Sequence, residues 1–374
     1  MPSLEQYQIA ASMLPRIGPV SARNLIAAFG DIDALFKMKA AHLRRIDGIG
    51  QYFAETILKH RNAALERAEK ELRFMEANDV NYAFFTDKAY PKKLSNCADA
   101  PLILYYIGDL SAINDKAVAV VGTRNATARG KESTNRIIKA LPEAGVSPVI
   151  VSGLAYGIDV EAHKAAIEHD LKTWAVFGHG FDIIYPVAHS GIAKKIVKNG
   201  GALISEFHST ARRDPKNFVR RNRIIAGLSD ATIVVESAKK GGAMVTADIA
   251  NSYNRDVFAV PGRTGDKYSQ GCNHLIKTNR AMLMESADDL LYIMNWMTKT
   301  RKKSSQQKQI EFNIQLTENE KIVVDVLKEK DYCDTDLLTK LSGLNIADLS
   351  VVLLSLEMKS VISALPGKIY ALNA

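Results

Sequence analysis

The sequence predicts an α/β protein: a mostly parallel sheet covered by helices, with a helical domain before it and a winged helix after it. Three observations lead to this fold class. Residues 1–80 contain only helical patterns. From residue 82 to about 290, short apolar runs alternate with helical runs, which is typical of a parallel sheet covered on both faces. The last part has three helical patterns and a final hairpin pattern. We expect domains at 1–80, 81–297 and 317–374, with a linker at 298–316.

Composition limits the classes of protein that need to be considered. The chain has 374 residues and a net charge of +8, which favours an anionic partner. Cys97, Cys272 and Cys333 lie far apart, so neither a disulfide framework nor a zinc site is expected. No signal peptide pattern or membrane-length apolar run occurs, so we expect a soluble, cytoplasmic protein without membrane contact. No His, Cys and Asp cluster has ligand spacing, so no metal or cofactor is expected.

The helical domain at 1–80 resembles a helix-hairpin-helix or SAM-like unit. Residues 14–30 and 46–60 share a pattern in which an apolar residue and a glycine turn precede a helix. In the second segment, Gly48-Ile49-Gly50 can present backbone N–H groups to a DNA phosphate. The alternative is a small helical bundle that uses glycine only to turn the chain.

The central domain at 81–297 carries the predicted sheet. Because ligands bind at the carboxyl ends of parallel strands, the turns after these strands are the first place to look for a site. The candidate strands are 118–121, 148–152, 173–177, 202–205, 231–235 and 256–260.

The charged, Gln/Ser-rich segment at 298–309 predicts a flexible linker, which we place at 298–316, and a winged helix follows it. Thr317 and Glu320 form a capping-box pattern that opens the first helix, and Pro366-Gly367 marks the turn of the terminal hairpin. The third helix carries Asp348 and Glu357. This acidity favours docking or regulation over reading of a DNA major groove.

The turn after the first candidate strand has the sequence Gly122-Thr123-Arg124. Gly122 permits close approach of the backbone to a ligand, and Thr123 and Arg124 lie where an anion meets helix N–H groups. The turn is neither G-x-G-x-x-G nor a Walker loop, so nucleotide binding is not implied. A glycine turn with a solvated arginine is the alternative.

The next turns also contain glycine. Gly153 and Gly157 flank a strand-to-helix turn, and Asp159 falls in the first turn of the following helix, where capping is favoured over catalysis. His163 lacks an acid partner and is expected to be structural. His179, between two glycines, lacks the companions that a metal needs. Gly241-Gly242 opens a further helix, so several glycine turns line one edge of the sheet.

The stretch at 211–223 is the most basic part of the central domain. Arginines at 220, 221 and 223 precede an apolar run, and cations near a helix N-terminus oppose the macrodipole, so we expect phosphate to compensate them. An aromatic residue among cations is typical of a single-strand groove, and a solvated basic face is the alternative. The candidate contacts are Lys216, Asn217, Phe218, Arg221, Asn222 and Arg223.

Several motifs occur in the order found in the DNA-processing protein A family (DprA, also called Smf), and the chain resembles this family over residues 82–290. The motifs are GTR (122–124), SGLAYGID (152–159), GHGFDIIYP (178–186), RNRIIAGLS (221–229), VVE (234–236), VTADIA (245–250), VFAVPG (257–262) and GCNHLI (271–276). The resemblance implies an extended Rossmann-like core that binds single-stranded DNA, forms a homodimer and acts without catalysis. It also implies a role in natural transformation, or competence, in which incoming single strands are protected and RecA recombinase is loaded.

The resemblance also implies site residues. Arg124, Arg221, Asn222 and Arg223 would line the DNA pocket, and Gly122, Gly153 and Gly157 would shape it. Lys216 and Phe218 lie where the family usually has a basic and an aromatic residue. The chain departs from the family pattern at Val219, His189, 241–244 and Asn279, which affects the fine geometry of the cleft.

Two other classes of function stay open at this point. One is a nucleotide-hydrolysing enzyme of the lysine-decarboxylase-like Rossmann group, although segment 239–248 lacks the Gly-rich loop of those enzymes. The other is a regulator that binds duplex DNA through the winged helix.

Overall fold

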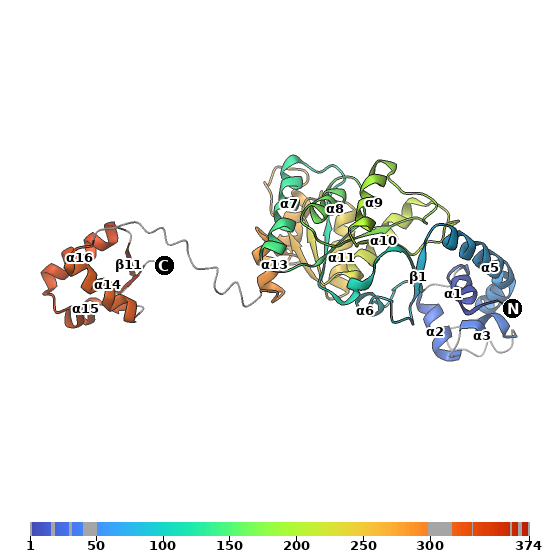
Figure 1. Cartoon of the computed structure of the whole chain (residues 1–374), viewed down its shortest axis with the longest axis horizontal. Helices are drawn as coiled ribbons and strands as arrows, with labels where there is room; N and C mark the ends of the chain where they lie inside the picture. The colour runs from blue at the N-terminus through green and yellow to red at the C-terminus, as the bar shows by residue number, and fades with distance from the viewer. Residues whose placement is uncertain are drawn as a thin grey trace. The chain divides into compact units, whose positions relative to one another are not determined.

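The computed structural model describes residues 2–15, 19–29, 32–39, 51–297, 316–330, 332–359, 361–365 and 369–372. Contacts divide the chain into two units, Met1–Thr298 and Lys299–Ala374 (Figure 1). The expected linker lies outside the described residues except for its last position. The boundary expected at residue 80 stays a prediction.

The first unit contains a mixed, mostly parallel sheet, as predicted. In the described residues it has nine strands in the order β1-β2-β6-β5-β4-β3-β7-β8-β9. All six expected strands form to within a residue or two and pair in parallel with one another. They are β3 (Ala117–Val121), β4 (Val149–Ser152), β5 (Thr173–Phe177), β6 (Ala202–Ser205), β7 (Ala231–Val234) and β8 (Asp256–Ala259).

Three strands toward the two ends of the sheet were not expected from the sequence. β1 (Asn81–Phe84) and β2 (Ile103–Gly108) extend one edge as antiparallel strands, with β2 paired to β6. The two-residue β9 (Met282–Leu283) pairs in parallel with β8 at the other edge. These segments lie outside the regular alternation of strand and helix that predicted the central strands.

Helices cover both faces of the sheet, and the residues of β3 are apolar on both faces for this reason. Val118 and Val120 pack on one face with apolar residues of α7 and α8, whereas Ala119 and Val121 pack on the other face with α10 and α11. Alternate residues of a strand point to opposite faces, so two apolar layers need an unbroken apolar strand. The covering helices are α7 (Ala128–Glu143), α8 (Ile158–Glu168), α9 (Ser190–Lys198), α10 (Pro215–Leu228), α11 (Gly242–Ser252), α12 (Gln270–Lys277) and α13 (Ala287–Ile293).

The N-terminal helices pack against the β1–β2 edge of the same unit. Residues of α1, α3 and α5 share an apolar cluster with Phe84 and Tyr105 of the sheet. The buried carboxylate of Glu71 accepts hydrogen bonds from the backbone N–H (2.8 Å) and hydroxyl (2.5 Å) of Ser209. The expected Gly48-Ile49-Gly50 hairpin lies outside the described residues. These helices are α1 (Leu4–Ser12), α2 (Pro19–Phe29), α3 (Ile32–Lys37) and α5 (Gln51–Ala77). The short α6 (Lys92–Ser95) follows β1 and packs against α10 instead.

The second unit is the expected winged helix. Its helices are α14 (Glu318–Lys330), α15 (Thr335–Ser342) and α16 (Ile346–Met358). Its strands are β10 (Tyr332–Asp334), β11 (Ile362–Leu365) and β12 (Ile369–Leu372), in the order β10-β12-β11. The hairpin strands β11 and β12 pair antiparallel, and the expected turn at Pro366-Gly367 lies outside the described residues.

The capping box predicted for the first helix of the second unit is confirmed. Glu320 accepts a hydrogen bond from the backbone N–H of Thr317 (2.7 Å), and the hydroxyl of Thr317 accepts one from the N–H of Glu320 (3.4 Å).

Among the described residues, no single helix has the length and apolar composition to cross a membrane. α15 and α16 satisfy that test only together, with a bend of 107° between them.

Candidate functional site

A pocket of about 430 Å³ lies at the carboxyl ends of the parallel strands. Its wall comes from the turn after β3, from α10, from the N-terminal end of α11 and from Lys267 and Tyr268. We call it the α10–α11 pocket. Eight of the predicted site residues line it: Gly122, Thr123, Arg124, Phe218, Arg221, Asn222, Gly241 and Gly242.

The turn after β3 is held in place by glycines. A Cβ at Gly122 would lie 2.4 Å from the side chain of Ile158, and one at Gly157, whose φ is 81°, would lie 2.1 Å from the carbonyl oxygen of Thr123. The Ile158 N–H donates to that same oxygen (3.2 Å). These glycines therefore let two loops of the protein pack together, and this packing places the exposed Arg124 on the rim of the pocket.

Arg221 lies in the floor of the pocket and is buried. Its Nη1 donates to the carbonyl oxygen of Gly153 (2.9 Å) and also to that of Val176, which joins α10 to the ends of β4 and β5. A Cβ at Gly153 would lie 2.6 Å from the guanidinium carbon, so only glycine leaves room for this side chain. Burial lowers the pKa of Arg221 to about 10, against the opposing effect of Asp159, so the group stays charged at neutral pH.

Asp159 lies in the first turn of α8, as expected, but it does not cap its own helix. The N-cap position is Gly157, and the Asp159 carboxylate accepts hydrogen bonds from the backbone N–H groups of Gly153 and Ala155 instead. Burial raises the pKa of Asp159, and the nearby Arg221 and these hydrogen bonds oppose that rise. The carboxylate thus stabilises the loop before the helix and balances the charge of Arg221.

Two histidines of the region have structural roles. His163 is fully buried, and its Nδ1 is 2.7 Å from the hydroxyl oxygen of Thr173. Burial lowers its pKa to about 3, so the ring is neutral. His179 stacks on Phe177 with 4.8 Å between ring centroids, and its Nδ1 lies 2.8 Å from the carbonyl oxygen of Gly180. In the portion that the structure describes, no group of three His, Cys, Asp or Glu residues is arranged to hold a metal.

Phe218 links the pocket to an aromatic rim. Its ring centroid is 5.7 Å from that of Tyr185, which is 49% exposed, and 6.4 Å from that of His179. Tyr185 was not among the predicted site residues. It lies five residues after Gly180, in the motif at 178–186 that marked the region.

The N-terminal end of α11 opens into the pocket. At Gly241 and Gly242, the nearest atom to an added Cβ would be 3.7 Å away, so neither is crowded by the protein. Asn222 Nδ2 donates to the carbonyl oxygen of Gly242 (3.3 Å) and fixes α10 against this end. Lys240 and Lys267 also line the pocket and were missed, because lysines in loops carry no pattern that assigns them to a site.

Five predicted site residues lie elsewhere. Lys216 and Asn217 are in the first turn of α10, outside the lining, and Asn217 Nδ2 donates to the carbonyl oxygen of Arg212 (3.0 Å). Gly153 and Gly157 lie behind the wall, where they make room for Arg221 and for the turn after β3.

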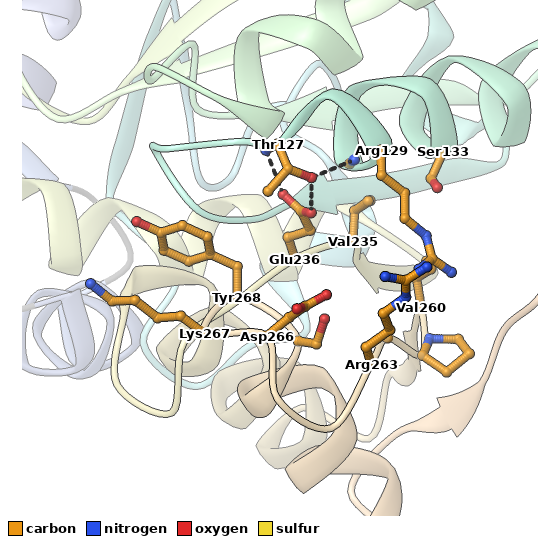
Figure 2. Close-up of a pocket in the computed structure, with 14 residues that line it drawn as sticks. Thr127, Arg129, Ser133, Val235, Glu236, Val260, Arg263, Asp266, Lys267 and Tyr268 are labelled. Carbon is orange, nitrogen blue, oxygen red and sulfur yellow. Dashed lines mark hydrogen bonds between the residues drawn. The ribbon is translucent and has the colours of Figure 1, made fainter.

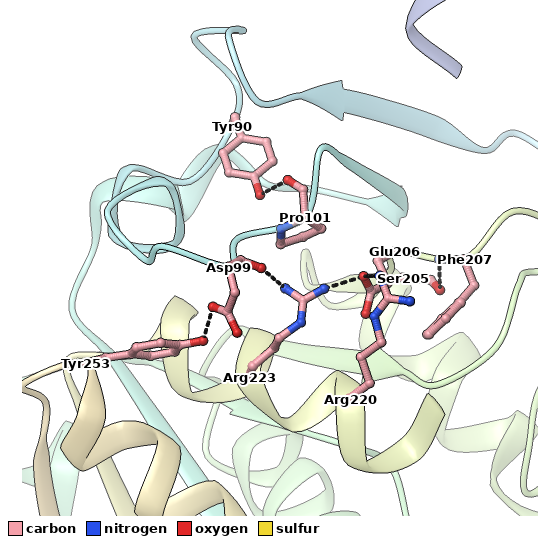
Figure 3. Close-up of polar contacts among 9 residues, drawn as sticks. All are labelled: Tyr90, Asp99, Pro101, Ser205, Glu206, Phe207, Arg220, Arg223 and Tyr253. Atoms are coloured by element: carbon pink, nitrogen blue, oxygen red, sulfur yellow. Dashed lines mark hydrogen bonds and ion pairs between the residues drawn. The ribbon is translucent and has the colours of Figure 1, made fainter. Parts of the chain in front are cut away.

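The fifth, Arg223, faces away from the pocket. Its guanidinium lies between the carbonyl oxygen of Asp99, at 2.5 Å, and the buried carboxylate of Glu206, as Figure 3 shows. Glu206 also pairs with Arg220 at 2.9 Å, and the hydroxyl of Tyr253 donates to Asp99. Residues two apart in a helix point in nearly opposite directions, so Arg221 and Arg223 cannot serve one site.

The expected conflict between these arginines and the helix dipole does not arise. α10 begins at Pro215, and the side chain of its N-cap Asp214 accepts a hydrogen bond from the Lys216 N–H (2.8 Å). The arginines at 220, 221 and 223 therefore lie beyond the first turn, where the dipole effect has faded. Protein carbonyls and Glu206 compensate all three. Arg124, Lys240 and Lys267 are the cations that face the open pocket.

The fold and this site together define a Rossmann-like protein with a cation-lined pocket at the strand ends and an added winged helix. Residues 81–295 match the family model of DNA recombination-mediator protein A, residues 9–65 match a helix-hairpin-helix motif, and residues 313–368 match the DprA winged helix domain. The chain belongs to the DNA recombination-mediator protein A family.

Individual relatives agree with this assignment. The chain is 35% identical to protein Smf of Synechocystis sp. over 77% of its own length and 72% of the relative. It is similar to the structure of DNA processing protein A from Streptococcus pneumoniae, with 32% identity and a TM-score of 0.64 over 77% of this chain and 96% of that one. A structure of the Helicobacter pylori protein, described for its single-stranded DNA binding mode, matches with 28% identity and a TM-score of 0.51. That match covers 58% of this chain and 96% of the other.

Proposed function

We propose that the chain binds single-stranded DNA in the α10–α11 pocket as a non-catalytic recombination mediator of natural transformation. In this role it protects incoming strands in the cytoplasm and helps load RecA, as a homodimer. The observation that carries the proposal is the grouping of Arg124, Lys240 and Lys267 around the open N-terminal end of α11, with Phe218 beside them. Cations and backbone N–H groups bind phosphate, and an aromatic ring stacks on a base.

The charges in the pocket favour a phosphate-bearing ligand. Within the described part of the chain, neither Arg124 nor Lys240 pairs with a carboxylate, whereas Arg221 and Asp159 largely balance each other. The Helicobacter pylori relative, whose structure is described for its binding of single-stranded DNA, supports a strand as this ligand.

The test is fluorescence anisotropy with labelled oligo-dT, single-stranded or annealed to its complement, over a series of salt concentrations. We expect the wild type to prefer the single strand. The double variant Arg124→Gln/Lys240→Gln should lose roughly tenfold in affinity at low salt, because two exposed charge contacts worth up to about 1 kcal/mol each disappear. The log–log salt slope should become shallower by about 0.7 for each phosphate that the variant no longer neutralises.

Lys198→Gln is the matched control. Lys198 is exposed in the last turn of α9, far from the carboxyl ends of the strands where the pocket lies. Its replacement should therefore leave the affinity for oligo-dT unchanged. Equal binding of single strand and duplex by the wild type would move the activity to the winged helix. Unchanged affinity in the double variant would show that the strand lies elsewhere.

RecA loading is tested separately. RecA hydrolyses ATP on single-stranded DNA, so its turnover on strands already covered by a competing single-strand-binding protein reports loading. We expect the chain to shorten the lag before turnover, and the double variant to shorten it less. An unchanged lag would confine the function to strand binding and protection.

A further inference from the structure

A second pocket, of about 450 Å³, lies beside the first and is drawn in Figure 2. Its wall comes from the first turn of α7, the end of β7 and the loop that follows β8. We call it the α7 pocket. Lys267 and Tyr268 line both pockets, so a ligand that leaves one across these side chains enters the other.

Cations from separate elements face the α7 pocket. Arg129 comes from the first turn of α7 and Arg263 from the loop after β8, and Figure 2 shows their guanidinium groups directed toward each other. Neither pairs with a carboxylate among the residues that the structure describes. Two like charges directed at each other repel unless an anion lies between them. Lys267 adds a third cation at the border of the two pockets.

Two carboxylates also line the pocket, and one of them is already engaged. Glu236 accepts hydrogen bonds from the backbone N–H (3.0 Å) and the hydroxyl (2.5 Å) of Thr127, the N-cap of α7. A Cβ at Gly130 would meet this carboxylate at 2.3 Å, so Glu236 is packed tightly against the helix. Asp266 is the second carboxylate, and the three cations exceed the two acids by one charge.

The loop that carries Arg263 is fixed next to that residue. Asn273 accepts a hydrogen bond from the Gly262 N–H (3.1 Å) and donates one to the Gly262 carbonyl oxygen (2.8 Å). A Cβ at Gly262 would lie 2.0 Å from the Ser269 hydroxyl, so the loop is also closely packed. Arg263 is therefore presented from a defined backbone position rather than from a free loop.

We infer that the α7 pocket binds a nucleotide phosphate of the same DNA strand, next to the nucleotide in the α10–α11 pocket. Arg129 and Arg263 hold the phosphate, and Tyr268, with Lys267 over its ring at 5.6 Å, lies where the strand crosses between the pockets. The volume is in the range of small-ligand sites. This inference rests on the proposed function, because it extends the track of the strand proposed there.

The test uses oligo-dT of increasing length with the full chain and its double variant Arg129→Gln/Arg263→Gln. Wild-type affinity should rise with length until both pockets are filled. The double variant should match the wild type on the shortest oligonucleotides that bind and fall roughly tenfold below it on longer ones. Its salt slope on long strands should be shallower by about 0.7 for each phosphate that is left without its arginine.

Arg136→Gln is the matched control, because Arg136 is exposed on the same helix, about two turns further on, and does not line the pocket. Thermal unfolding of all variants checks that each is folded. If the wild type binds oligo-dT and the double variant matches Arg136→Gln at every length, the α7 pocket is not on the track, and the proposed function is unaffected. If the wild type binds no single strand, the proposed function itself fails.

A final arm separates a strand from a free nucleotide, since both carry the same phosphate chemistry. Thermal shift with thymidine monophosphate is measured on the wild type and the double variant. Strand affinity that depends on the two arginines, without a shift by the free nucleotide, supports the strand. A shift that the double variant abolishes, together with unchanged strand affinity, would overturn it in favour of a free nucleotide.

Discussion

Arg221 and Arg223 stand two positions apart in α10, and the helix turns them to opposite sides. Arg221 enters the floor of the α10–α11 pocket, and Arg223 enters the network with Asp99 and Glu206 (Figure 3). Both are buried and donate hydrogen bonds to groups of the protein. Both were predicted to belong to one DNA site. A cluster of arginines looks the same in a sequence whether its partners are phosphates or groups of the protein.

Arg223→Ala should lower the stability of the fold. Glu206 would keep only Arg220, which is 52% exposed, and a buried carboxylate with one weak partner is costly. We expect the free energy of unfolding to fall by about 2–4 kcal/mol, measured by urea denaturation. Arg220→Ala, which removes a half-exposed partner of the same carboxylate, should cost no more than about 1 kcal/mol.

The contrary result would be informative. An Arg223→Ala protein with wild-type stability and weakened binding of oligo-dT would mean that the strand reaches this side of α10. Affinity measured on protein shown to be folded separates the two cases.

Three of the glycines around the site are crowded by the protein itself. Gly122, Gly153 and Gly157 were predicted to shape the site, and each is required where another atom comes close. That atom belongs to Ile158, Arg221 or Thr123, not to a ligand. A glycine in a sequence indicates that another group comes close, but it does not identify that group. Of the five predicted glycines, Gly241 and Gly242 are the two that are open toward the pocket.

The position of a strand or helix could be predicted where its residues followed a regular apolar pattern. The six central strands are buried on both faces and read as continuous apolar runs, so their positions followed from the sequence. β1, β2 and β9 lie toward the two ends of the sheet and outside the regular alternation of strand and helix, so no pattern predicted them. The start of α10 was visible in Asp214-Pro215, a cap followed by proline at the first helical position, but the arginines drew the predicted start downstream.

Glu320 of α14 should make the second unit sensitive to acid. Burial alone would raise its pKa, but hydrogen bonds from Lys359, Ser355 and the Thr317 N–H hold it at about 2, below the ordinary 4.5. A depressed pKa contributes stability that is complete above the ordinary value and is lost as pH falls toward 2. We expect the contribution at neutral pH to be about 1–3 kcal/mol.

Scanning calorimetry of Glu320→Gln against the wild type measures this contribution. The melting temperature of the second unit should differ at pH 7, and the difference should shrink as the pH is lowered below about 4.5. Glu318→Gln is the control, since Glu318 is exposed in the same turn. A difference that is constant with pH would show that the carboxylate charge is not the source of the stability.

At the scale of the whole molecule, both pockets belong to the first unit. A chain that ends at residue 310 keeps every residue of the α10–α11 pocket and the α7 pocket. We therefore expect it to bind oligo-dT within about threefold of the full chain, as measured by anisotropy at one fixed salt concentration. Loss of binding on truncation would place the strand on the winged helix, whose third helix carries Asp348 and Glu357.

The ordered motifs identified the family, but they could not reveal the α7 pocket. Arg129 and Arg263 are far apart in the sequence, and neither lies in a basic run. They meet only because α7 starts, and the loop after β8 leaves the sheet, at the same edge. The role of the N-terminal hairpin stays a prediction, because Gly48-Ile49-Gly50 lies outside the described residues.

The hydrogen bonds that hold Arg221 have a consequence for the entropy of binding. Carbonyl groups at the ends of two strands fix this side chain in the absence of a ligand, so the floor of the site has little conformational freedom left to lose. In the complex proposed above, the ordering cost then falls on the DNA strand. We therefore expect two strands of equal charge to differ in affinity when one is flexible and the other is already stacked. The affinity of the protein then depends on the stiffness of the nucleic acid.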